Sequence, residues 1–217
     1  MNTPLGARLD PQVLAKVLEA VADLNAEFLE ALGETARSAP DQFPLSHCLR
    51  SEFSRLMVAQ CRERGRCGVF LADAAFTDRI RWARVASGGD LDAFPQEQAH
   101  WLTIGQGVVA AHSALMVAWH IVHTVPSLVS VLLGMSDEVM CEFGKLSISD
   151  LAYIARSRFS WVRPRWADRA DVWASIIASG HSGSDQEPAA VLRCLKVSAS
   201  ESRRMLNSTA PGMTQEL

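Results

Sequence analysis

The sequence predicts an all-α, multi-helix protein whose C-terminal part contains a helix-turn-helix-like corner. Apolar residues recur at steps of three and four through most of the chain, which is the period of an amphipathic helix. Residues that cap helices precede several of these stretches, among them Asp10 before Pro11 and Ser147 before Ile148. Only Val69–Ala72 has the length and composition of a short strand, and one strand cannot form a sheet alone.

Length and composition restrict the class of protein. At 217 residues and 48% apolar, the chain can bury a core as one domain or as a domain with an appendage. Its net charge of −3 does not favour general nucleic-acid binding, so any such surface must be local. The first residues lack the apolar core of an export signal, and the five cysteines form no CxxC pair. We therefore expect reduced thiols in a cytoplasmic protein.

Changes in composition divide the chain. Ser87–Asp90 is polar and contains two glycines, which makes it the best candidate for a boundary. His181–Glu187 is typical of a flexible link, and Ala189–Leu206 follows it as a possible last helix. We expect three regions: an N-terminal helical region (1–94), a second helical domain (95–180), and a linker with a C-terminal helix and tail (181–217).

The first helix is expected to begin at Pro11, with Asp10 as its N-cap, and to end near Gly33 and the turn-rich segment 38–44. Its apolar residues alternate at steps of three and four, and its outer face is acidic. This seam either packs on its own domain or binds a partner helix, so we take it as a candidate oligomerisation surface. The seam consists of Leu14, Val17, Val21, Leu24 and Phe28. A second helix is expected over Ser46–Arg64.

The 39 residues from Gln98 to Ser136 contain no Asp, Glu, Lys or Arg. A helix this apolar, which we expect to begin at Pro95, is a core element, a membrane span or a partner-binding helix. Four histidines, a proline at position 126 and few flanking basic residues favour the soluble core helix. We therefore expect no membrane association.

A helix-turn-helix-like outline follows this stretch. One short helix is expected to begin at Ser136 and to end near Gly144. Ser147, with Asp150 three residues later, forms a capping-box pattern that predicts a second helix over Ile148–Ser157. Two short helices joined by a tight turn are typical of this DNA-binding motif, although other helical domains contain the same corner.

The segment from Arg156 to Arg169 contains five arginines and one acid, interleaved with aromatic residues. Arginine binds phosphates, base edges and aromatic faces, so this segment is a candidate DNA contact. The alternative is a loop whose arginines stack on tryptophans and pair with nearby acids. The sequence around Pro164 should be extended, because the residue before proline avoids the helical region. The candidate DNA-binding residues are Arg156, Arg158, Arg163, Arg165 and Arg169, with Trp161 and Trp166 orienting the loop.

The sequence gives no indication of a catalytic site. The sequence contains no phosphate loop, dinucleotide-binding fingerprint, GxSxG elbow or HExxH motif. His120 and His123 share a helix face with His112, but no carboxylate or cysteine nearby completes a metal site. We therefore expect no catalytic activity, no bound metal and no cofactor.

The stretch from Ala114 to Ile177 resembles FlhD, the flagellar master-regulator subunit that works with the zinc-containing subunit FlhC. The matching segments occur in one continuous order, and the segment 189–207 is similar to the family's final helix. The segments are Leu115-Met116-Val117-Ala118, Leu133-Gly134-Met135-Ser136-Asp137-Glu138, Leu146-Ser147-Ile148-Ser149-Asp150-Leu151, Ile154-Ala155 and Val162-Arg163-Pro164-Arg165-Trp166.

This resemblance implies an all-helical subunit of a transcription activator that binds promoter DNA together with an FlhC-like partner and recruits RNA polymerase. Similar regulators on conjugative elements switch on transfer genes instead of flagellar genes. Two features depart from the family. The cysteine that links FlhD chains would fall at Val162, so a disulfide-linked dimer is not supported, and residues 1–94 have no counterpart. The alternative function is a helical protein–protein adaptor with no role on nucleic acid.

Overall fold

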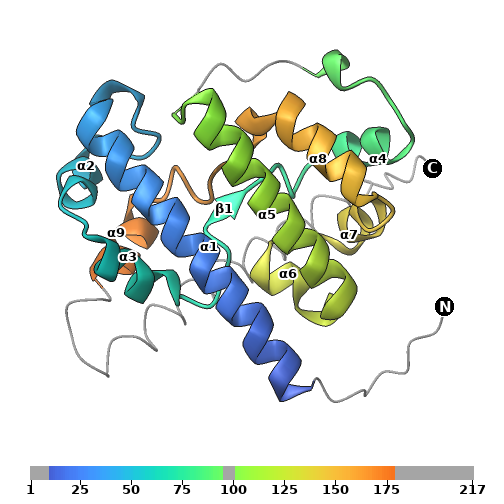
Figure 1. Ribbon diagram of the computed structural model, residues 1–217, viewed down its shortest axis with the longest axis horizontal. Helices are drawn as coiled ribbons and strands as arrows, with labels where there is room; N and C mark the ends of the chain where they lie inside the picture. The colour runs from blue at the N-terminus through green and yellow to red at the C-terminus, as the bar shows by residue number, and fades with distance from the viewer. Residues whose placement is uncertain (1–9, 95–100, 179–217) are drawn as a thin grey trace, which may run out of the picture.

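The computed structural model describes residues 10–94 and 101–178, and it confirms the all-α prediction (Figure 1). Within these residues there are nine α-helices and one antiparallel pair of two-residue strands. The helices are α1 (Pro11–Ser38), α2 (His47–Ser54), α3 (Val58–Gly65), α4 (Arg79–Ala86), α5 (Ile104–Thr124), α6 (Val129–Leu132), α7 (Asp137–Phe143), α8 (Ile148–Ser157) and α9 (Ala170–Ala178). The strands are β1 (Ala72–Asp73) and β2 (Arg163–Pro164). The predicted last helix, 189–206, lies outside the described residues.

Helix α1 begins where the sequence predicts. The Asp10 side chain accepts a hydrogen bond from the backbone N–H of Gln12, and Pro11 occupies the first helical position. The helix passes through Gly33 and ends at Ser38, at the start of the predicted turn-rich segment 38–44 and before Pro40. Gly33 is buried inside the helix, where a Cβ would lie 3.1 Å from the carbonyl oxygen of Phe53. The absence of a side chain at Gly33 therefore lets α2 pack closely against α1.

The single helix predicted over Ser46–Arg64 is two helices. The chain leaves the helical path at Arg55–Met57, and Met57 is extended, with φ −94° and ψ 154°. This break lets α2 pack against α1 and α9 while α3 lies along α1. Propensity alone did not reveal the break, because tertiary packing decided it.

Helix α5 begins at Ile104, later than the predicted start at Pro95, which lies outside the described residues. Thr103 and Gln106 form a capping box there. One face of α5 is buried against the rest of the chain, whereas Val109 on another face is 64% exposed. By length and composition α5 is also long and apolar enough to cross a membrane, and 33% of its most apolar stretch is buried in the protein. The core prediction therefore holds for one face of the helix.

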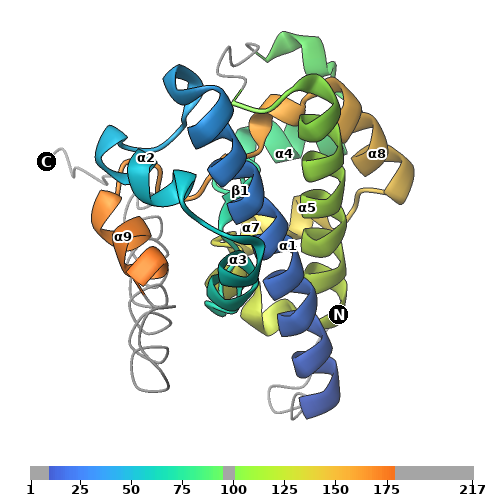
Figure 2. The same cartoon turned by 60° about the vertical axis from the view of Figure 1, so that its left-hand side comes forward.

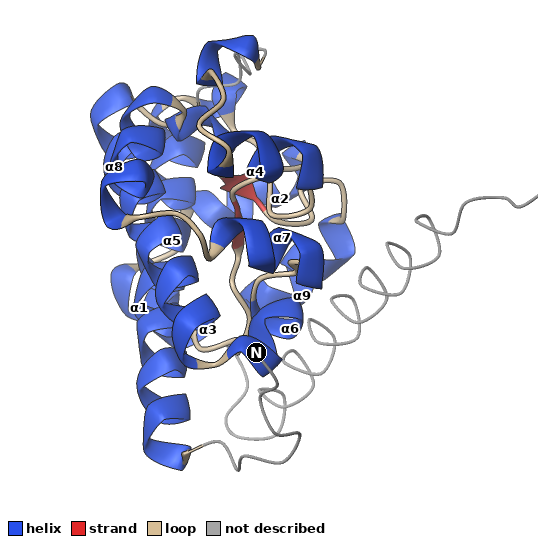
Figure 3. Cartoon of the chain, turned by 90° about the vertical axis from the view of Figure 1, so that its right-hand side faces the viewer, coloured by secondary structure: helices blue, strands red, loops and turns tan. Residues whose placement is uncertain are grey.

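The helices form two layers around the short strand pair. Helices α1, α5 and α8 lie on one side of the molecule, and α2, α6, α7 and α9 lie mainly on the other (Figure 3). Strand β1 pairs with β2 in register Ala72↔Pro164 and Asp73↔Arg163. The extended conformation predicted around Pro164 is thereby confirmed. One hydrophobic cluster includes residues from both sides of position 94, so the two predicted helical regions share a core.

Candidate nucleic-acid interface

The helix-turn-helix-like corner consists of α7, α8 and the four residues 144–147 between them. The Ser136 hydroxyl accepts a hydrogen bond from the backbone N–H of Val139 and caps α7. Hydrogen bonding to Ser136 also lowers the pKa of Glu138 in the first turn. The corner is anchored by apolar side chains that are at least 95% buried, namely Val139, Phe143, Leu146, Leu151 and Ile154.

The start of α8 carries the capping box that the sequence predicts. The Asp150 carboxylate accepts hydrogen bonds from the backbone N–H of Ser147, at 2.8 Å, and from its hydroxyl, at 2.7 Å. These bonds stabilise the ionised carboxylate, and hydrogen bonding to Ser147 lowers the pKa of Asp150. The Asp150 carboxylate therefore takes part in capping the start of α8.

Each helix of the corner is supported by another helix. Helix α7 packs on α4, and α8 packs on α5. The outward face of α8 carries Ile148, Ser149, Tyr153 and Arg156, all exposed. Tyr153 is 57% exposed and is therefore accessible to a partner. This face is therefore one part of the corner that can contact another molecule.

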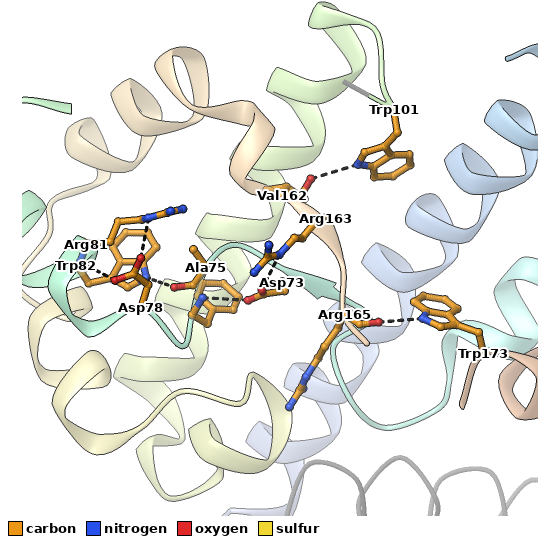
Figure 4. A network of polar contacts seen from close by, with 11 residues as sticks. Asp73, Ala75, Asp78, Arg81, Trp82, Trp101, Val162, Arg163, Arg165 and Trp173 are labelled. Atoms are coloured by element: carbon orange, nitrogen blue, oxygen red, sulfur yellow. Dashed lines mark hydrogen bonds and ion pairs between the residues drawn. The ribbon is translucent and has the colours of Figure 1, made fainter. Parts of the chain in front are cut away.

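The structure separates the five predicted arginines into two groups. Arg156, Arg163 and Arg169 are exposed. The Nε atom of Arg163 lies 3.2 Å from Oδ2 of Asp73, in a pair that links the two strands (Figure 4). Arg169 pairs with Asp171 at 2.8 Å and lowers the pKa of that carboxylate through their hydrogen bond. Arg163 and Arg169 therefore satisfy nearby aspartates, as the alternative interpretation of this segment expects.

Arg158 is not available for the phosphate contact predicted from the sequence. Its side chain is 4% exposed overall, and its guanidinium group bonds to residues of the turn before α5. The Nε atom donates to the carbonyl oxygen of Leu91 at 3.2 Å, and Nη2 pairs with Asp92. Arg158 thus connects the end of α8 to the turn that follows α4.

Arg165 is also buried, with 6% exposed, which corrects the second prediction of a phosphate contact. Its Nη1 donates to the carbonyl oxygen of Leu132 at 3.1 Å, and its guanidinium lies 4.5 Å from the ring centre of Trp166. Its backbone carbonyl accepts a hydrogen bond from Trp173 Nε1 (Figure 4). Arg165 is therefore a packing residue of the segment that leads into α9.

Trp161 and Trp166 are buried, with 2% and 6% exposed. Trp161 packs edge-on against Trp82 of α4, and the Arg81 guanidinium lies 4.5 Å from its ring centre. Trp166 adopts a positive φ of 55°, which is uncommon for a residue with a side chain. Both tryptophans hold the segment 158–166 in place, and neither presents its ring to a nucleic acid.

The apolar seam of α1 faces the interior of its own domain, which corrects its assignment as an oligomerisation surface. Val17, Val21, Leu24 and Phe28 are at most 8% exposed. Leu14, near the start of the helix, is half-buried. The seam packs on α2, α3 and α5, which explains its spacing without a second chain.

The histidines of α5 do not come together as a metal site. Nδ1 of His123 lies 2.8 Å from the carbonyl oxygen of Trp119, and His120 lies beside Thr124. Among the residues that the structure describes, no three histidine, cysteine, aspartate or glutamate side chains are grouped to hold a metal ion.

Sequence reasoning missed two buried polar residues that organise the molecule. Asn25 is fully buried in α1, and its amide nitrogen donates to the carbonyl oxygens of Gly65 and Val69. Arg64, 1% exposed, donates to the carbonyl oxygen of Ile177 at 2.6 Å. Burial lowers the pKa of Arg64. The only sequence signal for Asn25 is a polar residue beside the apolar seam of α1.

No family model matches the chain, and neither the curated proteins nor the solved structures contain a match.

Proposed function

We propose that this protein is a DNA-binding subunit of a cytoplasmic transcription activator. It acts as an oligomer, either of its own copies or with an FlhC-like zinc-containing subunit. The assembly recruits RNA polymerase to promoters of flagellar or mobile-element transfer genes. The observation that carries the proposal is the corner of α7 and α8, with an outward α8 face containing Tyr153 and Arg156. This corner lies within the stretch that resembles FlhD, in a sequence without a recognisable catalytic motif.

The chemistry of α8 limits how the helix meets DNA. Arg156 lies in the last turn, exposed, and suits a phosphate or a base edge. Asp150 lies at the other end, and its negative charge disfavours a phosphate there. Contact therefore involves the Tyr153–Arg156 end of the helix. So small a basic surface gives modest affinity, and the partner subunit must supply much of the base reading.

The test uses the protein in its native cell. A tagged full-length chain is crosslinked and purified, the bound DNA is sequenced, and co-purifying proteins are identified by mass spectrometry. We expect discrete promoter fragments together with one zinc-binding regulator. The proposal would be contradicted if neither promoter DNA nor a zinc-binding regulator co-purified, with or without crosslinking.

A matched pair of variants then tests the surface. In the purified complex, Arg156→Ala should weaken promoter binding and reduce the slope of log affinity against log salt by about 1. The control is Arg62→Ala, which removes an exposed arginine from α3, well apart from α8 in Figure 1. An equal salt slope for the two variants would exclude Arg156 from the interface.

The second candidate function is a protein–protein adaptor without a nucleic-acid role. Ile104 and Val109 of α5 favour it, because they are 72% and 64% exposed on a helix that lacks charged residues. This function predicts a stable complex with another protein and no retention on DNA at low salt.

A further inference from the structure

A groove with an apolar lining runs between α1 and α5. Figure 2 shows the two helices side by side, and the cavity between them has a volume of about 380 Å³. From α1 it is lined by Leu24, Phe28 and Ala31, and from α5 by Val109, Ala110 and Ala114. Leu24 and Phe28 belong to the apolar seam of α1, are at most 8% exposed, and form part of the floor of the groove.

Alanine side chains leave the groove unfilled, and contacts within the core fix its walls. Ala31, Ala110 and Ala114 leave the space between the helices unfilled. Phe28 is fixed by an edge-on contact with Trp101, with ring centres 5.2 Å apart. The carbonyl of Trp101 in turn accepts a hydrogen bond from the Thr35 hydroxyl at 3.0 Å. Since these walls belong to the core, the groove is formed before any partner arrives.

The charged side chains that line or flank the groove on α1 are acidic. Glu27 lines it, and Glu34 accepts a hydrogen bond of 3.3 Å from Gln106 at the end where α5 begins. The next acid toward the start of α1, Asp23, is exposed. Helix α5 contains no lysine or arginine to neutralise these carboxylates. A partner gains most from this surface if it brings positive charge to the rim and apolar side chains to the floor.

We propose that this groove docks a basic amphipathic helix of a partner protein. Two parallel ridges with an apolar floor accept a helix that inserts apolar side chains at steps of three and four. Lysines or arginines beside these anchors face Glu27 and Glu34. The site is distinct from the α8 face proposed for DNA, so either inference can fail while the other stands.

The test uses the full-length protein and two synthetic peptides of sixteen residues with capped ends. Both carry leucines at helical steps of three and four. One has lysines on the remaining positions beside the leucines, and the other has glutamates there. Fluorescence anisotropy should show saturable binding of the lysine peptide, weakening as salt increases, and at least tenfold weaker binding of the glutamate peptide. Absence of saturable binding, or equal affinity for the two peptides, would overturn the proposal.

Substitutions locate the binding site. Ala110→Leu, which fills the groove, and Glu27→Lys, which reverses its charge, should each weaken binding of the lysine peptide at least tenfold. The matched controls are Ala59→Leu on α3 and Glu52→Lys on α2, both at exposed positions. Val109→Lys provides a second groove variant at a position that is 64% exposed, so its folding is secure. Unchanged affinity in the folded groove variants would also overturn the proposal, and DNA binding of the same preparations is measured separately.

Discussion

The guanidinium group of Arg165 lies directly over Gly134. A Cβ placed on this glycine would come 2.5 Å from Nη2 of Arg165, and Gly134 itself has φ +75°. The sequence distance between the two residues hides this contact, which joins the turn after α6 to the segment that precedes α9. Because Gly134 has no side chain, the Arg165 guanidinium fits inside the molecule, where it donates to the carbonyl oxygen of Leu132 and is not available to a phosphate.

Gly134→Ala should destabilise the protein by about 2–4 kcal/mol, because it combines a strained backbone with a clash. Gly88→Ala separates the two effects, since Gly88 also has a positive φ but a Cβ added there would meet no heavy atom within 4 Å. It should cost about 1 kcal/mol. Urea unfolding measures both, and equal midpoints for the two variants would show that the Arg165 contact adds nothing.

Asn25→Ala should destabilise the protein by about 2–4 kcal/mol. The substitution leaves the buried backbone N–H of Leu71 and the carbonyl oxygen of Val69 without their hydrogen bonds of 2.9 Å and 2.7 Å. Asp23→Ala, at an exposed position of the same helix, is the control and should change stability by less than about 0.5 kcal/mol. Equal unfolding free energies for the two variants would contradict this role of Asn25.

Arg158→Ala should destabilise the protein by about 1–3 kcal/mol, whereas Arg156→Ala should leave stability nearly unchanged. The buried Arg158 side chain bonds to the carbonyl oxygen of Leu91, but its partner Asp92 is 87% exposed, so solvent screens the ion pair. Thermal and urea unfolding of the two variants measure the difference. The prediction fails if Arg156→Ala proves the more destabilising substitution.

Cys61 should resist alkylation in the folded protein, whereas Cys48 and Cys141 should react. Cys61 is buried, and burial, followed by the nearby Glu30 carboxylate, raises the pKa of its thiol. Iodoacetamide at neutral pH, followed by peptide mapping, measures the modified fraction at each cysteine with and without denaturant. Rapid modification of Cys61 without denaturant would show that this part of the core opens readily.

The Ser147–Asp150 capping box should make the stability of the corner depend on pH in the acid range. The folded-state pKa of Asp150 lies below its ordinary value near 4, so the ionised carboxylate stabilises the fold above that value. The contribution is lost as the pH falls through the lowered folded-state pKa. Ser147→Ala should cost about 1 kcal/mol at neutral pH, and the difference from the unmodified protein should shrink in acid. Urea unfolding at several pH values measures it; a difference that is independent of pH would exclude the carboxylate's role.

Local signals predicted much of the fold. Asp10, Ser136 and Ser147 lie directly before the starts of helices, because caps act on the backbone within the first turn. The break between α2 and α3 carried no comparable signal. It exists because α2 packs against both α1 and α9, whereas α3 lies along α1.

Capping, periodicity and proline sterics act over a few residues, so the helical class, most helix starts and the extended backbone at Pro164 follow from the order of the amino acids. Which of the five arginines remain at the surface depends on the tertiary fold. Arg158 and Arg165 are buried because carbonyl groups and Asp92 from other segments meet their guanidinium groups. The ring of the adjacent residue, Trp166, also packs on Arg165. Burial of a charge depends on partners brought together by the fold, and neither composition nor spacing along the chain contains that information.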